Sequence, residues 1–336
     1  MSTRAGVDLG GTKIQTVIID SQHAVVGQLR VPTPKDGGPQ GVADAIVGTI
    51  RNACSLAGIE PSSLTGIGVG APGTIDDAAG TVTQARNVTA DWTDSFALAG
   101  AITTALGGGA VHLGNDVDVG TEAEFQLGAG REFETLLGVF WGTGVGGGII
   151  LRGRPWSGRG GAAGEIGHMV VKLGGALCTC GRNGCLEAYA GRLAMERRAR
   201  ALHEKGQDTS LFKIMKKRDR DNLSSGVWAK ALEQQDELAI ELIDRAVAAL
   251  AAGIASAVNL LDVEAVVIGG GLGTRLGEPY VTRIREAMVP HLFVDHNPPV
   301  VRLVALGDLG GAIGAALQVP GGTITPGLTT TPPLNA

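Results

Sequence analysis

The amino-acid sequence predicts an α/β protein built from two halves of related design. Residues 4–20 have the pattern of a strand, a glycine-containing turn and a second strand, and residues 136–153 repeat that plan. Two such hairpins about 130 residues apart are typical of corresponding parts of an internal repeat. In a chain of 336 residues we therefore expect two domains, each with apolar strands and helices.

Composition narrows the class of protein. Hydrophobic residues make up 44% of the chain and aromatic residues only 4%, so the core must consist mainly of Ala, Val, Leu and Ile. The 54 glycines have no collagen period and cluster at strand ends, which indicates backbone close to a ligand. A net charge of −5 argues against general nucleic-acid binding. Neither a signal peptide nor a membrane-spanning run is visible, and we expect no membrane partner.

The first half can be assigned element by element. The spacing of apolar residues predicts a helix around residues 38–57, which places Cys54 in the core, and a strand at 65–70. Residues 87–92 form a loop that leads into another helix. Residues 111–125 are a strand that ends in Asn115-Asp116 and is followed by a helix. An Asp at a strand end beside glycine turns suits a general base, and an N-cap of the helix is an equally good interpretation of Asp116.

The second half has longer helical patterns. Residues 187–220 are predicted to be helical and end in a basic run at 213–220, interpreted as a solvated face, with an acidic partner as the alternative. We expect one long helix at 227–261, a glycine cluster at 269–273 between a buried strand and a helix, and a last helix at 307–319. Residues 320–336 are rich in Pro, Thr and Gly, and are interpreted as a flexible tail.

Glycine turns occur at three strand ends. The first contains Gly10, Gly11 and Thr12, the second spans residues 142–148, and the third spans residues 269–273. Bare backbone N–H groups and a Thr hydroxyl can hold phosphate oxygens, although the spacing is not that of the P-loop. A single turn of this kind is best explained as an ordinary hairpin, but three together favour a phosphate-containing ligand.

Residues 164–187 contain three of the four cysteines. Cys178, Cys180 and Cys185 supply three thiolates, and His168 could supply a nitrogen, which together make the Cys3His set typical of structural zinc. Three small buried hydrophobic residues are the competing interpretation. Thiols that bind a metal fit a reducing compartment, so we expect a cytoplasmic protein. A zinc-fixed loop would also position Glu165 and Glu187 beside the outward nitrogen of His168, an arrangement suited to the hydroxyls of a sugar.

Four motifs of the sequence together resemble those of a known family. Residues 8–13 (DLGGTK), GTGVGGG, GEIGHM and CTCGRNGCLE together resemble the ROK family of sugar kinases and sugar-responsive repressors, over about residues 4–319. The cysteine motif after GEIGH is highly specific, whereas the glycine turns alone are not. The resemblance implies an actin-like, hexokinase-like (ribonuclease H-like) ATPase fold, with two α/β domains around a deep cleft. It suggests a small domain at 1–115 completed by helix 307–319, and a large domain at 116–306.

The resemblance also implies roles for individual residues. Asp116 matches the catalytic base, and it binds the sugar together with Asn87, Asn115, Glu165, His168 and Glu187. The zinc ligands are matched by His168, Cys178, Cys180 and Cys185. The turns that hold ATP are matched by Asp8, Gly10, Gly11, Thr12, Lys13, Gly142, Thr143, Gly144, Gly269, Gly270 and Gly271.

The activity implied is transfer of phosphate from ATP, with Mg²⁺, to a hexose, and glucose is the first choice. Fructose, mannose, N-acetylglucosamine, N-acetylmannosamine and allose are alternatives, as is polyphosphate as donor. A sugar-sensing repressor would need a DNA-binding segment ahead of the first strand, for which no room is expected. A non-catalytic sugar-binding protein is the third possibility. The family commonly forms homodimers, with a dimer of dimers as a further state.

Overall fold

The computed structural model describes residues 2–320, and the tail predicted at 320–336 therefore lies almost entirely outside the described residues. The described chain forms two compact units. The first contains residues up to Val119 together with those from Gly311 onward, and the second contains Gly120–Gly310. The division falls inside one helix near residue 119 and at the start of the last helix. Among the described residues, no helix has the length and apolar character that a membrane span requires.

The first unit is built on a five-stranded sheet with the order β3-β2-β1-β4-β7. Strand β1 pairs antiparallel with β2 and parallel with β4, which in turn pairs parallel with β7. The β1–β2 hairpin was predicted from the Gly10–Thr12 turn. The strands are β1 (Arg4–Leu9), β2 (Lys13–Ile19), β3 (Val25–Pro32), β4 (Gly66–Ala71) and β7 (Val111–Asn115).

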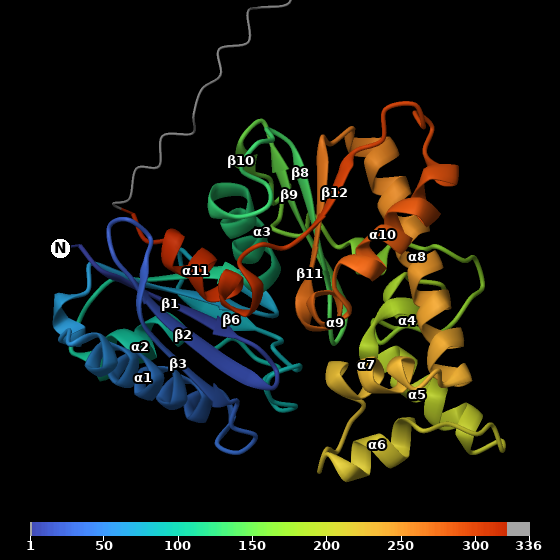
Figure 1. The fold of residues 1–336 in the computed structure, drawn as a ribbon. Coiled ribbons are helices and arrows are strands. Elements are labelled where there is room, and N and C mark those ends of the chain that lie inside the picture. The colour runs from blue at the N-terminus through green and yellow to red at the C-terminus, as the bar shows by residue number, and fades with distance from the viewer. Residues whose placement is uncertain (1, 321–336) are drawn as a thin grey trace, which may run out of the picture. The chain divides into compact units, whose positions relative to one another are not determined.

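Helices cover both faces of this sheet (Figure 1). Helices α1 (Gly38–Ala57) and α2 (Leu98–Leu106) lie on one face, and α11 (Gly310–Leu317) lies on the other. Side chains alternate along β1, so Val7 and Leu9 enter the core beneath α1. A proline in the first turn and a left-handed Gly58 at the end explain the bounds of α1. The remaining elements of the first unit are η1 (Pro61–Ser63), β5 (Thr74–Asp76) and β6 (Thr81–Thr83), and η4 (Gly307–Leu309) precedes α11 at the end of the second unit.

The second unit repeats the same sheet topology, with the order β10-β9-β8-β11-β12. Strand β8 pairs antiparallel with β9 and parallel with β11, which pairs parallel with β12. Each strand therefore has a counterpart in the first sheet, which confirms the internal repeat predicted from the two hairpins. The strands are β8 (Leu136–Trp141), β9 (Val145–Leu151), β10 (Arg154–Pro155), β11 (Ala265–Gly269) and β12 (Val300–Leu303).

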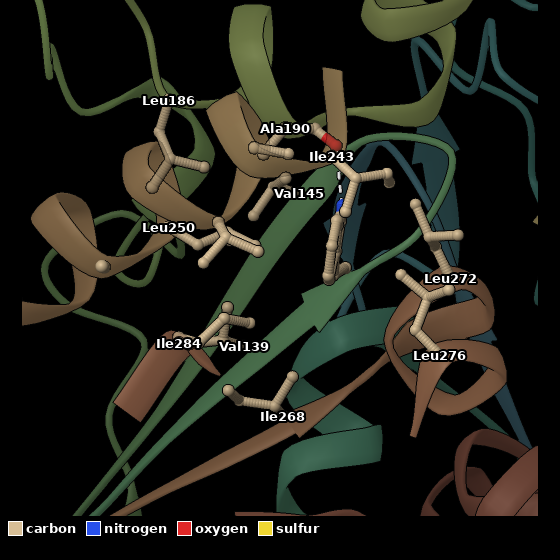
Figure 2. Packing of buried hydrophobic residues seen from close by; sticks show 14 of the residues in the cluster. Val139, Val145, Leu186, Ala190, Ile243, Leu250, Ile268, Leu272, Leu276 and Ile284 are labelled. Atoms are coloured by element: carbon tan, nitrogen blue, oxygen red, sulfur yellow. Dashed lines mark hydrogen bonds between the residues drawn. The ribbon is translucent and has the colours of Figure 1, made fainter. Parts of the chain in front are cut away.

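The core of the second unit lies between this sheet and the long helix α8 (Glu237–Leu261). Figure 2 shows Val139 of β8 and Ile268 of β11 facing Leu250 of α8, and all three are buried. A smaller cluster on the opposite face includes Leu136 and Val267. The other helices are α3 (Asp116–Leu127), α4 (Glu187–Ala190), α5 (Arg192–His203), α6 (Leu211–Lys217), α7 (Ser225–Glu233), α9 (Gly270–Leu276) and α10 (Glu278–Met288), with η2 (Ile166–His168) and η3 (Val289–His291).

Two long helices predicted from the sequence are interrupted. The helical region at 187–220 is three helices, α4, α5 and α6, separated by Gly191 and by the loop around Gly206. The helix at 227–261 is split into α7 and α8, because the Asp236 side chain accepts the N–H of Ala239 and begins a new helix. The spacing of apolar residues continues through both breaks, so the sequence pattern did not reveal where the helices end.

Candidate active site

The first glycine turn is fixed from several sides. The N–H of Gly10 donates to the carbonyl of Lys13 at 2.9 Å, which closes the hairpin. A Cβ on Gly11 would lie 2.2 Å from the carbonyl oxygen of Asn87, so only glycine allows this approach. The Lys35 ammonium donates to the carbonyls of both Gly11 and Val88, and thereby ties the turn to the Asn87 loop. The structure thus brings together two predicted groups, the turn and Asn87.

Asn115 and Asp116 lie where β7 passes into α3. The Asn115 Oδ1 accepts the N–H groups of Val117 at 3.0 Å and Asp118 at 3.3 Å, so Asn115 caps the helix. The Asp116 Oδ1 also accepts the N–H of Val117, at 3.0 Å. The N-cap considered for Asp116 is therefore supplied mainly by its neighbour. Asp116 itself is the first residue of α3.

Asp8 lies at the same edge of the sheet as Asp116. Asp8 is paired with Gly70 on β4, and the next residue of β4, Ala71, is paired with Asn115 at the end of β7. Carboxyl ends of parallel strands meet at one edge, which is where such folds place ligands. Burial, followed by the charge of Asp8, raises the pKa of the Asp116 carboxyl from 3.8 to about 7. A carboxyl with that pKa can take up and release a proton near neutral pH.

The second glycine turn is held by the start of α5. The N–H of Gly142 donates to the carbonyl of Gly144 at 2.9 Å. The N–H groups of Arg192 and Leu193 donate to the carbonyls of Gly142 and Thr143, each at 3.1 Å. Because these are the first two residues of α5, the turn satisfies donors that no side chain caps.

A buried arginine strengthens this attachment. Arg192 is 6% exposed, and its Nη2 donates to the Thr143 hydroxyl at 3.1 Å. Its Nη1 donates to the carbonyl of Leu223 at 2.9 Å, while the N–H of Leu223 donates to Glu196 at 2.9 Å. Because a guanidinium can only donate, the Thr143 oxygen accepts from Arg192 and its own proton points elsewhere. Thr143 can therefore donate that proton to an anionic oxygen.

Glu187 lies against the same turn. Its Oε2 accepts the N–H of Val145 at 3.0 Å, and its Oε1 accepts the Thr179 hydroxyl at 3.0 Å. A Cβ on Gly144 would lie 2.2 Å from the Glu187 Oε2. One carboxylate thus joins the glycine turn to the cysteine-containing loop.

The third glycine cluster packs on the second. Gly270 has a left-handed φ of 80°, and a Cβ there would lie 2.6 Å from the carbonyl oxygen of Trp141. Gly271 and Gly142 are neighbours as well. Trp141 is fully buried and its indole N–H donates to the carbonyl of Ala190 at 2.7 Å, the dashed bond that ends on Ala190 in Figure 2. The second and third glycine clusters, which contain the predicted nucleotide residues of the second unit, therefore pack against each other.

The four predicted metal ligands gather in one cluster. The ligand atoms of His168, Cys178, Cys180 and Cys185 all lie within 4.8 Å of one another. The Sγ atoms of Cys180 and Cys185 are 3.7 Å apart and the cysteines are free rather than bridged. Tetrahedral zinc with Zn–S distances of about 2.3 Å requires sulfur atoms about 3.8 Å apart, so this donor set fits the ion.

The two nitrogens of His168 face different groups. Nδ1 lies 3.8 Å from the Sγ of Cys178, and Nε2 lies 4.0 Å from the Glu165 carboxylate. The Nδ1 edge of the ring therefore faces the cysteine cluster, and the Nε2 edge faces Glu165. The roles predicted for the two nitrogens, one on zinc and the other toward a sugar, stay predictions.

Sequence reasoning missed Lys35, Thr179, Arg192 and Glu196. Thr179 lies inside the cysteine motif but was given no role there. Lys35, Arg192 and Glu196 belong to no recognisable motif, although Arg192 follows the cysteine motif closely. The predicted residues form one group in each unit. The first unit holds Asp8, Gly10, Gly11, Thr12, Lys13, Asn87, Asn115 and Asp116, and the second holds Gly142, Thr143, Gly144, Glu165, His168, Cys178, Cys180, Cys185, Glu187, Gly269, Gly270 and Gly271.

Two α/β units with the same strand order and with glycine turns at strand ends are typical of the two-domain, actin-like and hexokinase-like fold. Comparison with known proteins supports this assignment of the fold. A ROK family profile matches residues 4–321, and the chain belongs to the ROK family. It resembles a ROK family glucokinase of Streptomyces griseus, solved with glucose and AMPPNP, at 30% identity and a TM-score of 0.78, covering 94% of this chain and 99% of that one.

Curated relatives point the same way. The chain is 32% identical to a glucokinase of Thermotoga maritima over 295 residues, covering 85% of this chain and 87% of the relative. It is 30% identical to a glucokinase of Streptomyces coelicolor, covering 94% and 97%. An N-acetyl-D-glucosamine kinase of Pectobacterium atrosepticum, 29% identical, also matches over 93% of this chain. The protein is a sugar kinase of the ROK family.

Proposed function

We propose that the protein transfers the γ-phosphate of ATP to a hydroxyl of glucose, giving glucose 6-phosphate. The observation that carries the proposal is the Asp116 carboxyl, which lies at the sheet edge beside Asp8 and has a pKa near 7. The glucokinases among the relatives support the choice of sugar. A base whose pKa lies close to the working pH is the most effective catalyst of proton transfer.

Asp116 would accept the proton of the attacking sugar hydroxyl. General-base help of this kind is worth about 10²–10⁴-fold in rate. Asn115 and Asn87 would bind neighbouring hydroxyls, and their positions are fixed by the α3 cap and by the Gly11 turn respectively. Glu165, His168 and Glu187 would bind the remaining hydroxyls. Acceptors and donors fixed in advance reduce the entropy lost on binding.

The glycine turns would hold the phosphates of ATP. Phosphoryl transfer needs placement and charge neutralisation more than covalent chemistry. Backbone N–H groups of the turns and the Thr143 hydroxyl, oriented by Arg192, are suited to anionic oxygens. Asp8 would help to hold the magnesium ion. That ion, when bound with ATP, supplies positive charge to the phosphates.

We further propose that His168, Cys178, Cys180 and Cys185 bind one structural zinc ion. The ion would fix the loop from which Thr179 contacts Glu187 and would hold the ring of His168 toward Glu165. Three free thiols in this cluster also favour a reducing, cytoplasmic location. A homodimer is proposed from the family's common state.

A coupled ADP-release assay with magnesium-ATP tests the activity and names the sugar. We expect turnover with glucose to exceed that with fructose, mannose, N-acetylglucosamine and N-acetylmannosamine by at least about tenfold in kcat/KM. Greater turnover with an amino sugar would reassign the substrate within the same reaction. Binding of glucose by calorimetry without turnover, with ATP or with polyphosphate, would contradict the kinase activity.

A further inference from the structure

A groove of about 430 Å³ lies on the second unit between α5 and α6. That volume falls in the range of small-molecule sites, which is roughly 300–1,000 Å³. Its lining comes from the last turn of α5, from α6 and from the residues just after α6. None of these residues has a role in the proposed transfer or in the zinc cluster.

Three cations line the groove, and one of them is held in place. Arg200 donates from Nε and Nη2 to the buried Glu196 carboxylate at 3.1 and 2.6 Å. Its guanidinium also lies over the ring of Phe212, at 5.3 Å from the centroid. A guanidinium fixed before binding loses little freedom when an anion arrives. Lys216 and Arg220 complete the set.

The basic residues around the groove also favour the binding of an anion. The basic run at 213–220 has five cationic side chains and one acidic one, in a chain whose net charge is −5. A local excess of positive charge on an acidic protein attracts small anions to that place. Lys213 and Lys217 have the same charge as Lys216 but do not line the groove.

The rest of the lining suits hydroxyl groups and an apolar face. His203 Nδ1 lies 3.0 Å from the carbonyl of Gln207 and, because a carbonyl only accepts, Nδ1 must carry the proton. The Nε2 of neutral His203 is then an acceptor, as are the carboxylates of Glu204 and Asp219. Phe212 and Met215 supply apolar surface between these groups.

We propose that this groove binds a phosphorylated sugar, at a site separate from the catalytic residues. The phosphate would pair with Arg200, Lys216 and Arg220. Sugar hydroxyls would donate to His203, Glu204 and Asp219, and the apolar face of the sugar would cover Phe212 and Met215. The proposal rests on the groove alone, so it stands or falls independently of the proposed activity.

Methionine-methyl NMR tests this directly, since the chain has only five methionines and Met215 lines the groove. Glucose 6-phosphate is titrated into protein labelled with [methyl-¹³C]methionine. We expect the Met215 signal to shift and saturate, while the buried Met288 signal reports that the fold is unchanged. Glucose alone should leave Met215 unmoved. Inorganic phosphate should bind more weakly than the sugar phosphate.

Matched variants locate the binding. Lys216→Gln with Arg220→Gln should weaken glucose 6-phosphate binding at Met215 by at least about tenfold, because charged hydrogen bonds are lost. Lys213→Gln with Lys217→Gln removes the same amount of charge from α6, outside the groove, and should leave the affinity within about twofold. The proposal would be overturned by any of three results. These are the absence of a saturable Met215 shift, equal weakening in both double variants, or an equal Met215 shift with glucose alone.

Discussion

Replacing Asp116 with Asn should stabilise the folded protein at alkaline pH while removing the proposed base. The pKa of the Asp116 carboxyl is raised from 3.8 to about 7, first by burial and then by Asp8. The folded state therefore binds this proton more tightly than the unfolded state does. Consequently, stability is lost as the pH rises from about 4 to about 7 and the carboxylate ionises inside the fold.

The size of the effect follows from the shift in pKa. A difference of about three pKa units corresponds to about 4 kcal/mol once the group is ionised in both states. Asp116 is only partly covered, so we expect roughly 2–4 kcal/mol above pH 7. Asn has the same size and keeps the Oδ1 that accepts the N–H of Val117. The substitution thus removes the charge and preserves the hydrogen bond.

Thermal unfolding of the two proteins between pH 4 and pH 8 measures this difference. At about 2–4 °C per kcal/mol, Asp116→Asn should unfold about 4–16 °C higher than the wild type at pH 8. The gap should shrink toward zero near pH 4. Asp94→Asn, which removes an exposed carboxylate from the same unit, controls for the loss of one charge. A gap of equal size at every pH, or a less stable Asp116→Asn protein at pH 8, would refute the reasoning.

Three other predictions concern the second unit. Removal of metal by a chelator should release one zinc per chain and weaken glucose binding measured by calorimetry; unchanged binding would contradict the positioning role of the metal. Gly144→Ala should lower kcat/KM by at least about tenfold, since its Cβ displaces the Glu187 carboxylate, whereas Gly160→Ala, in open space, should not. Arg192→Lys should raise the KM for ATP by about tenfold and leave the KM for glucose nearly unchanged, because Lys cannot bridge Thr143 and Leu223. Arg197→Lys, which changes an exposed residue of the same helix, is the control. An equal rise in both KM values would contradict the role of Arg192 in orienting Thr143.

Much of the fold could be predicted because local signals and tertiary packing agree. The two glycine-turn hairpins predicted a repeat, and both sheets have the same strand order. The pattern around Asn115-Asp116 predicted a strand-to-helix junction, which is where β7 meets α3. The cysteine spacing likewise predicted a four-ligand cluster, and the ligand atoms meet. In each case the chemistry lies within a short stretch of sequence.

The features missed depend on contacts between distant residues. Lys35 reaches the Gly11 turn from beyond β3, and Arg192 joins Thr143 to Leu223, residues 80 positions apart. A lone Lys or Arg has no local pattern that reveals such a partner. The helix breaks at Gly191 and Asp236 were missed for a related reason, since apolar spacing continued across both of them.

The central claim is that Asp116 is the base of an ATP-dependent glucose kinase. Its most direct test is transfer of labelled γ-phosphate from ATP to glucose by the wild type and by Asp116→Asn, with glucose binding measured in parallel by calorimetry. We predict labelled glucose 6-phosphate from the wild type. The variant should be slower by about 10²–10⁴-fold and bind glucose within a fewfold of the wild-type affinity. Equal rates of transfer by the two proteins would contradict the claim.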